Sequence, residues 1–201
     1  VRNPEKDIVE SLFKRVVKAA EGAALGTETN VTYEVMHGNY SLLPNETLQR
    51  LIHEKLLNRG GIKFSQNEIK YAQTIYDSLI EPSQEVGDQE KILPYKITHG
   101  YGSTDVGDVS WNVPTGGFNT ATWVPGTSAH SWQAIAAGGT SIGLKGMKLA
   151  AEVLFDTAKH IYLNNSIVVE ANKELELKTG KDFSYYPLLG DRDPPLKYRE
   201  N

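Results

Sequence analysis

The sequence predicts a mixed α/β fold, in which a sheet is flanked by helices. Three observations lead to this prediction: long segments with apolar residues at helical spacing, short segments of alternating apolar and polar residues, and long crossovers between the short segments. At 201 residues the chain is long enough for one domain, or for one and a half, with a sizeable core.

Five segments carry the apolar spacing of helices, and most of them have recognisable ends. The first follows Asn3-Pro4, a good helix start, and stops at Gly26. Asn45 is suited to capping the second helix, and Ser65 with Glu68 forms a capping box for the third. The helices are expected at 5–25, 45–60, 65–79, 140–163 and 166–178.

Alternating segments rich in β-forming residues are expected to be strands, at 31–43, 96–99, 109–113 and 118–124. The segment 140–163 has an apolar surface too broad for a helix facing water, so it is expected to pack on the sheet. A lone strand at 31–43 leaves both edges unpaired, which indicates that its partners are missing from the front of the sequence. The polar segment 81–91 has no apolar period and is expected to be an exposed loop or a poorly ordered insertion.

Composition limits the classes of function. The chain has 21 basic and 25 acidic residues without long runs of either sign, which argues against nucleic-acid and membrane-surface binding. It has no cysteine, so any metal must be held by histidine and carboxylate. No apolar run approaches the roughly 18 residues that span a bilayer, and the start lacks a signal pattern, so we expect a cytoplasmic protein. Because the first residue is Val1 and not methionine, we expect that something has been removed.

Of the five histidines, His130 has the most informative position. It follows P-G-T-S-A after a predicted strand and comes directly before a predicted helix. Rigid elements on both sides would hold the imidazole in one direction, as metal coordination requires. The other histidines are His37, explained by a turn, His53 and His160, expected to be ordinary helical residues, and His99, whose role stays open.

A second group of polar side chains lies in a glycine-flanked turn. Ser103, Thr104, Asp105 and Asp108 supply donors and acceptors suited to orienting a polar ligand. The alternative is an Asx or Ser/Thr turn followed by a helix cap. Ser131 beside His130 does not make a catalytic triad, and no G-x-S-x-G elbow, phosphate loop or dinucleotide fingerprint is present.

Several motifs resemble a known family. These are G-S-T-D-V-G-D-V-S-W (102–111), P-G-T-S-A-H-S-W-Q (125–133) and G-G-T-S-I-G-L-K-G-M-K-L-A-A (138–151), supported by A-E-G-A-A-L-G-T-E-T (20–29) and S-L-L-P-N-E-T-L (41–48). Together they resemble the C-terminal part of the dinuclear-zinc amidohydrolases, closest to the aminobenzoyl-glutamate hydrolase branch. The resemblance implies a partial three-layer catalytic domain with a mixed sheet, preceded by the end of an α+β lid.

The same resemblance implies a domain division and a set of site residues. Residues 1–44 would end the lid, which forms homodimers in the family, and 45–201 would belong to the catalytic domain, with a loop at 81–95 and an extended tail at 187–201. His130 would be the last metal ligand, and Ser103, Thr104 and Asp105 would help to bind substrate. In the family two zinc ions activate a bridging water that attacks an amide carbonyl, with a glutamate as general base.

The chain departs from the family pattern in one important way. The remaining ligands and the base come from an H-x-D motif, a bridging aspartate and a Glu-Glu pair in the N-terminal half, and no H-x-D occurs here. One ligand cannot hold two zinc ions. We therefore expect the C-terminal part of an amidohydrolase for N-acyl or N-aroyl amino acids, inactive alone. The alternative is a non-catalytic binding or assembly module.

Overall fold

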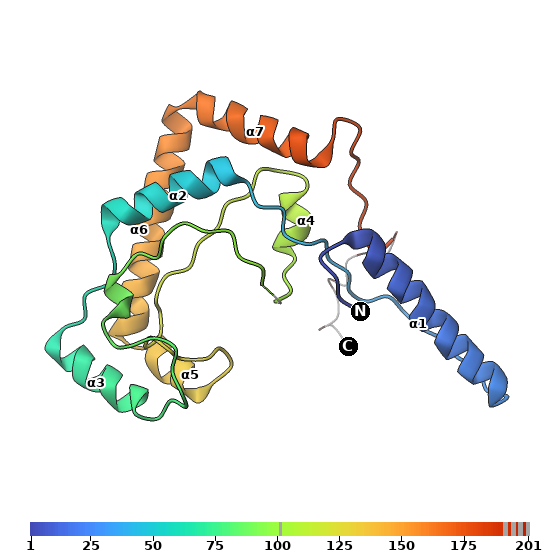
Figure 1. The fold of residues 1–201 in the computed structure, drawn as a ribbon, viewed down its shortest axis with the longest axis horizontal. Helices are drawn as coiled ribbons and strands as arrows, with labels where there is room; N and C mark the ends of the chain where they lie inside the picture. The colour runs from blue at the N-terminus through green and yellow to red at the C-terminus, as the bar shows by residue number, and fades with distance from the viewer. Residues whose placement is uncertain (101, 191–192, 194–195, 197–198, 200–201) are drawn as a thin grey trace. The chain divides into compact units, whose positions relative to one another are not determined.

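The computed structural model describes residues 1–100, 102–190, 193, 196 and 199 (Figure 1). The predicted tail at 187–201 lies partly outside this described range. The elements are α1 (Lys6–Gly26), α2 (Glu46–Arg59), α3 (Gln66–Tyr76), the 3-10 helix η1 (Asp88–Glu90), α4 (Val106–Ser110), α5 (Trp132–Gly138), α6 (Ser141–Leu163) and α7 (Asn165–Thr179). No strand occurs among the described residues.

The predicted α/β class, with its mixed sheet and three layers, is therefore wrong for this structure. The segments 31–43, 96–99 and 118–124 have alternating side chains but irregular backbone. A strand is defined by its partner, and no described segment forms a ladder with any of them. Alternation alone therefore predicted the strands incorrectly, and the described residues contain no sheet on which α6 could pack.

The predicted strand at 109–113 fails for a different reason, because its first two residues end α4. The side chain of Ser110 turns back and donates a hydrogen bond to the carbonyl of Gly107 at 2.5 Å. Gly107 is buried, and a Cβ at that position would lie 2.0 Å from the carbonyl oxygen of Tyr40. Close tertiary packing thus overrides the local β preference.

The five long helices are confirmed, and the end signals explain their positions. The side chain of Asn45 accepts a hydrogen bond from the Leu48 amide at 3.1 Å. Ser65 and Glu68 form the predicted capping box, with distances of 3.3 Å and 2.5 Å. The segment 81–91 is more ordered than predicted, since it contains η1 and buries Gln89.

The chain divides into two compact units. The first unit contains Val1–Pro44, Gly100–Thr115 and Leu175–Asn201, and the second contains Asn45–His99 and Gly116–Glu174. In the first unit no side chain of α1 is fully buried, although Phe13 packs edge-on against Tyr33 with ring centroids 6.1 Å apart.

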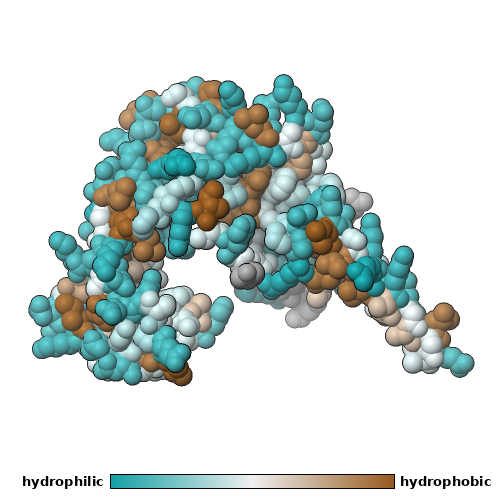
Figure 2. All heavy atoms as spheres, viewed as in Figure 1, coloured by the Kyte–Doolittle hydropathy of each residue, from teal (hydrophilic) through white to brown (hydrophobic). Residues whose placement is uncertain are grey.

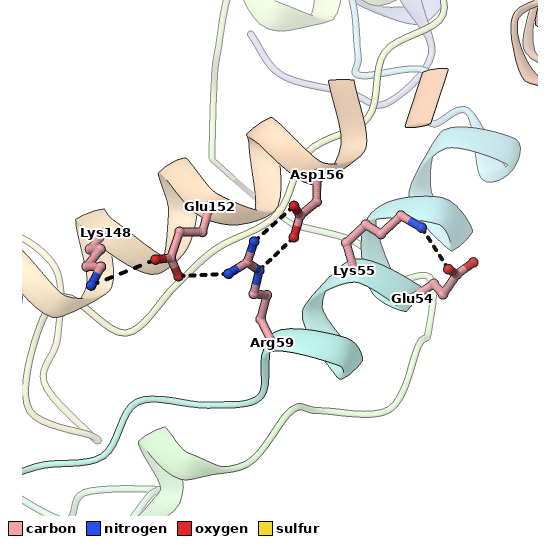
Figure 3. A network of polar contacts seen from close by, with 6 residues as sticks. All are labelled: Glu54, Lys55, Arg59, Lys148, Glu152 and Asp156. Atoms are coloured by element: carbon pink, nitrogen blue, oxygen red, sulfur yellow. Dashed lines mark hydrogen bonds and ion pairs between the residues drawn. The ribbon is translucent and has the colours of Figure 1, made fainter. Parts of the chain in front are cut away.

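The second unit has a continuous apolar core and packs α6 against both α2 and α5. The core consists of Ile62, Phe64, Ala72, Ile75, Val124, Ala137 and Ile142. At the surface, Arg59 of α2 reaches both carboxylate oxygens of Asp156 on α6, at 2.6 Å and 2.9 Å, and continues to Glu152 and Lys148 (Figure 3). Exposed ion pairs contribute little to stability because water and salt screen them, so this network mainly fixes the orientation of the side chains.

In the second unit, the carboxylate of Glu68 is held by three hydrogen-bond donors. Its carboxylate accepts hydrogen bonds from Lys145 at 2.5 Å, from the Ser141 hydroxyl at 2.7 Å and from the Ser65 amide at 2.5 Å. The hydrogen bond from Lys145, followed by those from Ser141 and Ser65, lowers the pKa of Glu68 to about 2. All these donors favour the ionised carboxylate.

We expect the contribution of Glu68 to stability to depend on pH. Because the folded-state pKa lies below the unfolded value, the contribution is complete above pH 4.5 and is lost as the pH falls toward about 2. Glu68→Gln keeps a capping-box residue but removes the charge. In urea unfolding the variant should be less stable at pH 7, and its deficit should shrink between about pH 5 and pH 2. A deficit that stays constant over this range would contradict the assignment.

Candidate functional site

The residues predicted to act on a substrate lie in two loops of the structure. Ser103, Thr104 and Asp105 directly precede α4 in the first unit. His130 directly precedes Ser131, the N-cap of α5, in the second unit. The structure therefore brings the first three together and places His130 in a separate compact unit.

The loop before α4 exposes all three candidate side chains. The hydroxyl of Thr104 accepts a hydrogen bond from the Val106 amide at 3.2 Å, which is the Ser/Thr turn considered as the alternative. Ser103 and Asp105 make no side-chain hydrogen bond to the described residues, and Asp105 does not cap α4 through its side chain. Their donors and acceptors are thus open to solvent and to a ligand.

Helix α4 is anchored to the segment 40–43. The Ser110 hydroxyl accepts a hydrogen bond from the Leu43 amide at 2.8 Å, and the Trp111 indole donates to the Ser41 carbonyl at 2.8 Å. The Tyr40 and Trp111 rings meet edge-on, with centroids 5.4 Å apart. The exposed loop is therefore attached to a well-packed support, an arrangement common in binding sites.

His130 is exposed on a loop that is fixed at both ends. Val124 is buried before the loop, and its carbonyl accepts a hydrogen bond from the Thr127 amide at 3.1 Å. After the loop, the Ser131 hydroxyl accepts from the Ala134 amide at 3.2 Å and donates to the Ser128 carbonyl at 2.7 Å. Ser131 is thus the N-cap of α5.

The His130 loop has two energetically unfavourable features. His130 has φ +58, in the left-handed region that side chains other than glycine rarely adopt. The Thr127 hydroxyl is buried without a hydrogen-bond partner among the described residues. Such features cost free energy and cluster at functional sites. Among the described histidines, His130 is the one with a positive φ.

The environments of three other histidines match ordinary structural roles. The His53 ring packs against Tyr95 with centroids 5.9 Å apart, and both lie in the second unit. His160 lies 3.3 Å from the Lys55 ammonium, and His37 lies 3.2 Å from the Asn39 amide. His99 is exposed.

Across the described residues, no three His, Cys, Asp or Glu side chains gather in a way that could hold a metal ion. The exposed imidazole of His130 fits the role of one ligand, and carboxylates or histidines from elsewhere would have to supply the others. Asp108 was grouped with the ligand-binding residues from the sequence, whereas in the structure it is hydrogen-bonded to Tyr40 and Tyr185.

A comparison with curated proteins identifies a relative. The chain is 31% identical over 223 aligned positions to one of the subunits of p-aminobenzoyl-glutamate hydrolase from Escherichia coli (strain K12), and 98% of the chain takes part. Over nearly its whole length the chain is similar to the aminobenzoyl-glutamate hydrolase branch of the amidohydrolases. The family resemblance of the motifs around Ser103 and His130 is thereby confirmed.

The aminobenzoyl-glutamate hydrolase relative is considerably longer than this chain. The chain spans 46% of the relative's length. No family model matches the sequence, and no solved structure matches it significantly. None of the helices within the described residues is long and apolar enough to cross a membrane.

Proposed function

We propose that this chain is the C-terminal part of a zinc-dependent amidohydrolase that cleaves the amide bond of an N-acyl or N-aroyl amino acid. The observation that carries the proposal is the 31% identity to the p-aminobenzoyl-glutamate hydrolase relative over nearly the whole chain. Because that relative is a p-aminobenzoyl-glutamate hydrolase subunit, we infer a substrate that resembles aminobenzoyl-glutamate.

His130 would hold one zinc ion in this enzyme. Its imidazole is exposed and sits on a loop restrained by Val124 and by the Ser131 cap, so it can present a nitrogen in a constant direction. When bound, zinc supplies Lewis-acid chemistry at the amide carbonyl and lowers the pKa of a coordinated water. Ser103, Thr104 and Asp105 would orient the polar groups of the substrate.

We also propose that the chain acts only together with further protein. On α6 alone, Leu144, Met147, Leu154 and Phe155 are each more than half exposed. Figure 2 shows apolar side chains in patches on the surface. Clustered apolar exposure of this kind marks surfaces that other protein covers. More of the same polypeptide would cover α6 and supply the missing ligands, and residues 1–44 would take part in a homodimer.

The test uses the natural polypeptide that contains this sequence, beside a chain of residues 1–201. We expect the natural polypeptide to bind two zinc ions and to hydrolyse p-aminobenzoyl-glutamate, and the chain of residues 1–201 to do neither. Elemental analysis and release of p-aminobenzoate are the measurements. A natural polypeptide without zinc and without hydrolysis would contradict the proposal and favour a non-catalytic binding or assembly module.

A further inference from the structure

The residues that follow α7 form part of the support of α4. In the first unit the ring of Tyr185 lies against Tyr40 with centroids 5.2 Å apart, and Phe183 lies against Trp111 at 5.3 Å. Tyr40 is 4% exposed, so these aromatic contacts form the centre of the unit. These ring contacts therefore help to hold the segment 183–186 in place.

One hydrogen bond connects this segment directly to α4. The Tyr185 hydroxyl donates to Oδ1 of Asp108 at 2.9 Å, and the same oxygen accepts from the Tyr40 amide at 3.4 Å. The Asp108 amide in turn donates to the Asp105 carbonyl at 3.1 Å. A chain of hydrogen bonds thus runs from Tyr185 through Asp108 to the backbone of the exposed candidate loop.

The Tyr185 hydroxyl stays protonated and can therefore always donate its hydrogen bond. Burial, followed by the hydrogen bond to Asp108, raises the pKa of Tyr185 to about 12. The hydroxyl therefore keeps its proton at physiological pH and continues to donate. A hydrogen bond to a carboxylate is stronger than one between neutral groups, so it is suited to holding α4 in one position.

We propose that Tyr185 and Asp108 are positioning residues that hold the Ser103–Thr104–Asp105 loop in its substrate-binding conformation. The inference rests on the proposed function, in which this loop binds substrate. It assigns a role in that site to Tyr185, which lies outside all of the family motifs.

The test is Tyr185→Phe in the natural polypeptide that contains this sequence, because the variant keeps the ring and removes only the hydroxyl. A lost hydrogen bond corresponds to a KM about two- to tenfold higher. The value of kcat and the zinc content should not change, because the loop binds ground state and transition state alike. Amide hydrogen exchange should accelerate at residues 103–110 and not in α2.

Tyr186→Phe is the matched control. Its hydroxyl contacts Lys6 and Glu10 on α1 and has no contact with α4 in the described structure. The control should leave KM and exchange at 103–110 at wild-type values. Asp108→Ala should raise KM at least as much as Tyr185→Phe, and Asp108→Asn, which keeps an acceptor oxygen, should raise it less.

Amide hydrogen exchange at 103–110 and the kinetics of hydrolysis together test the role of Tyr185 separately from the proposed function. A wild-type protein that hydrolyses no N-acyl amino acid would refute the proposed function, and exchange at 103–110 would still decide whether Tyr185 positions the loop. Unchanged exchange in Tyr185→Phe would overturn the positioning role. Faster exchange with unchanged KM in an active enzyme would overturn it as well, because the loop would then not bind substrate.

Discussion

Replacing His130 with alanine in the natural polypeptide should lower hydrolysis of p-aminobenzoyl-glutamate by more than about 100-fold. Changes to residues that merely support a metal ligand cost about 10–100-fold in affinity or activity, so loss of the ligand itself should cost more. Zinc content should fall in the same variant. The urea midpoint of the metal-free protein should stay close to wild type, because the imidazole is exposed.

His160→Ala is the control for this experiment. His160 is half-buried on α6, where it lies beside Lys55, and its position does not resemble that of a ligand. We expect it to retain zinc and turnover. If His130→Ala also retained both, His130 would have no place in the metal site.

Gly146→Ala should destabilise the protein clearly. Gly146 is buried in α6, and an added Cβ would lie 2.4 Å from the carbonyl oxygen of Ala121 and 2.7 Å from the Thr122 methyl. The Gly146 carbonyl also accepts a hydrogen bond from Thr120 at 3.0 Å, so the segment 120–122 cannot retreat without losing it. Overpacking of this kind costs about 1–3 kcal/mol in the free energy of unfolding.

The same substitution at Gly22 should have the opposite effect on stability. Gly22 lies inside α1, and nothing stands within 4 Å of an added Cβ. Alanine is favoured over glycine in helices by about 0.5–1 kcal/mol, so Gly22→Ala should stabilise the protein. Urea unfolding of the two variants should therefore shift in opposite directions. A stabilising Gly146→Ala would show that α6 does not pack closely on 120–122.

The helices could be predicted from the sequence because their signals are local. The caps at Asn45 and at Ser65 with Glu68 act within three residues, and the structure contains both. The strands were predicted incorrectly because a strand depends on a partner distant in the sequence. The segments 31–43 and 118–124 alternate as strands do, but the described chain offers them no ladder.

The candidate site stays a prediction. The motifs drew attention to the loops that hold Ser103 and His130, and the relative supports the resemblance that these motifs indicated. No signal in the sequence indicated the positive φ of His130. The hydrogen bond to Asp108 could not be predicted, because its partner Tyr185 lies 77 positions along the chain.

His130 is proposed to bind zinc together with ligands from outside residues 1–201. The most direct measurement is anomalous scattering at the zinc edge from crystals of the natural polypeptide. We predict a zinc peak at about 2.0–2.1 Å from an imidazole nitrogen of His130. Zinc peaks elsewhere with none at His130, or no zinc in an active enzyme, would contradict the account.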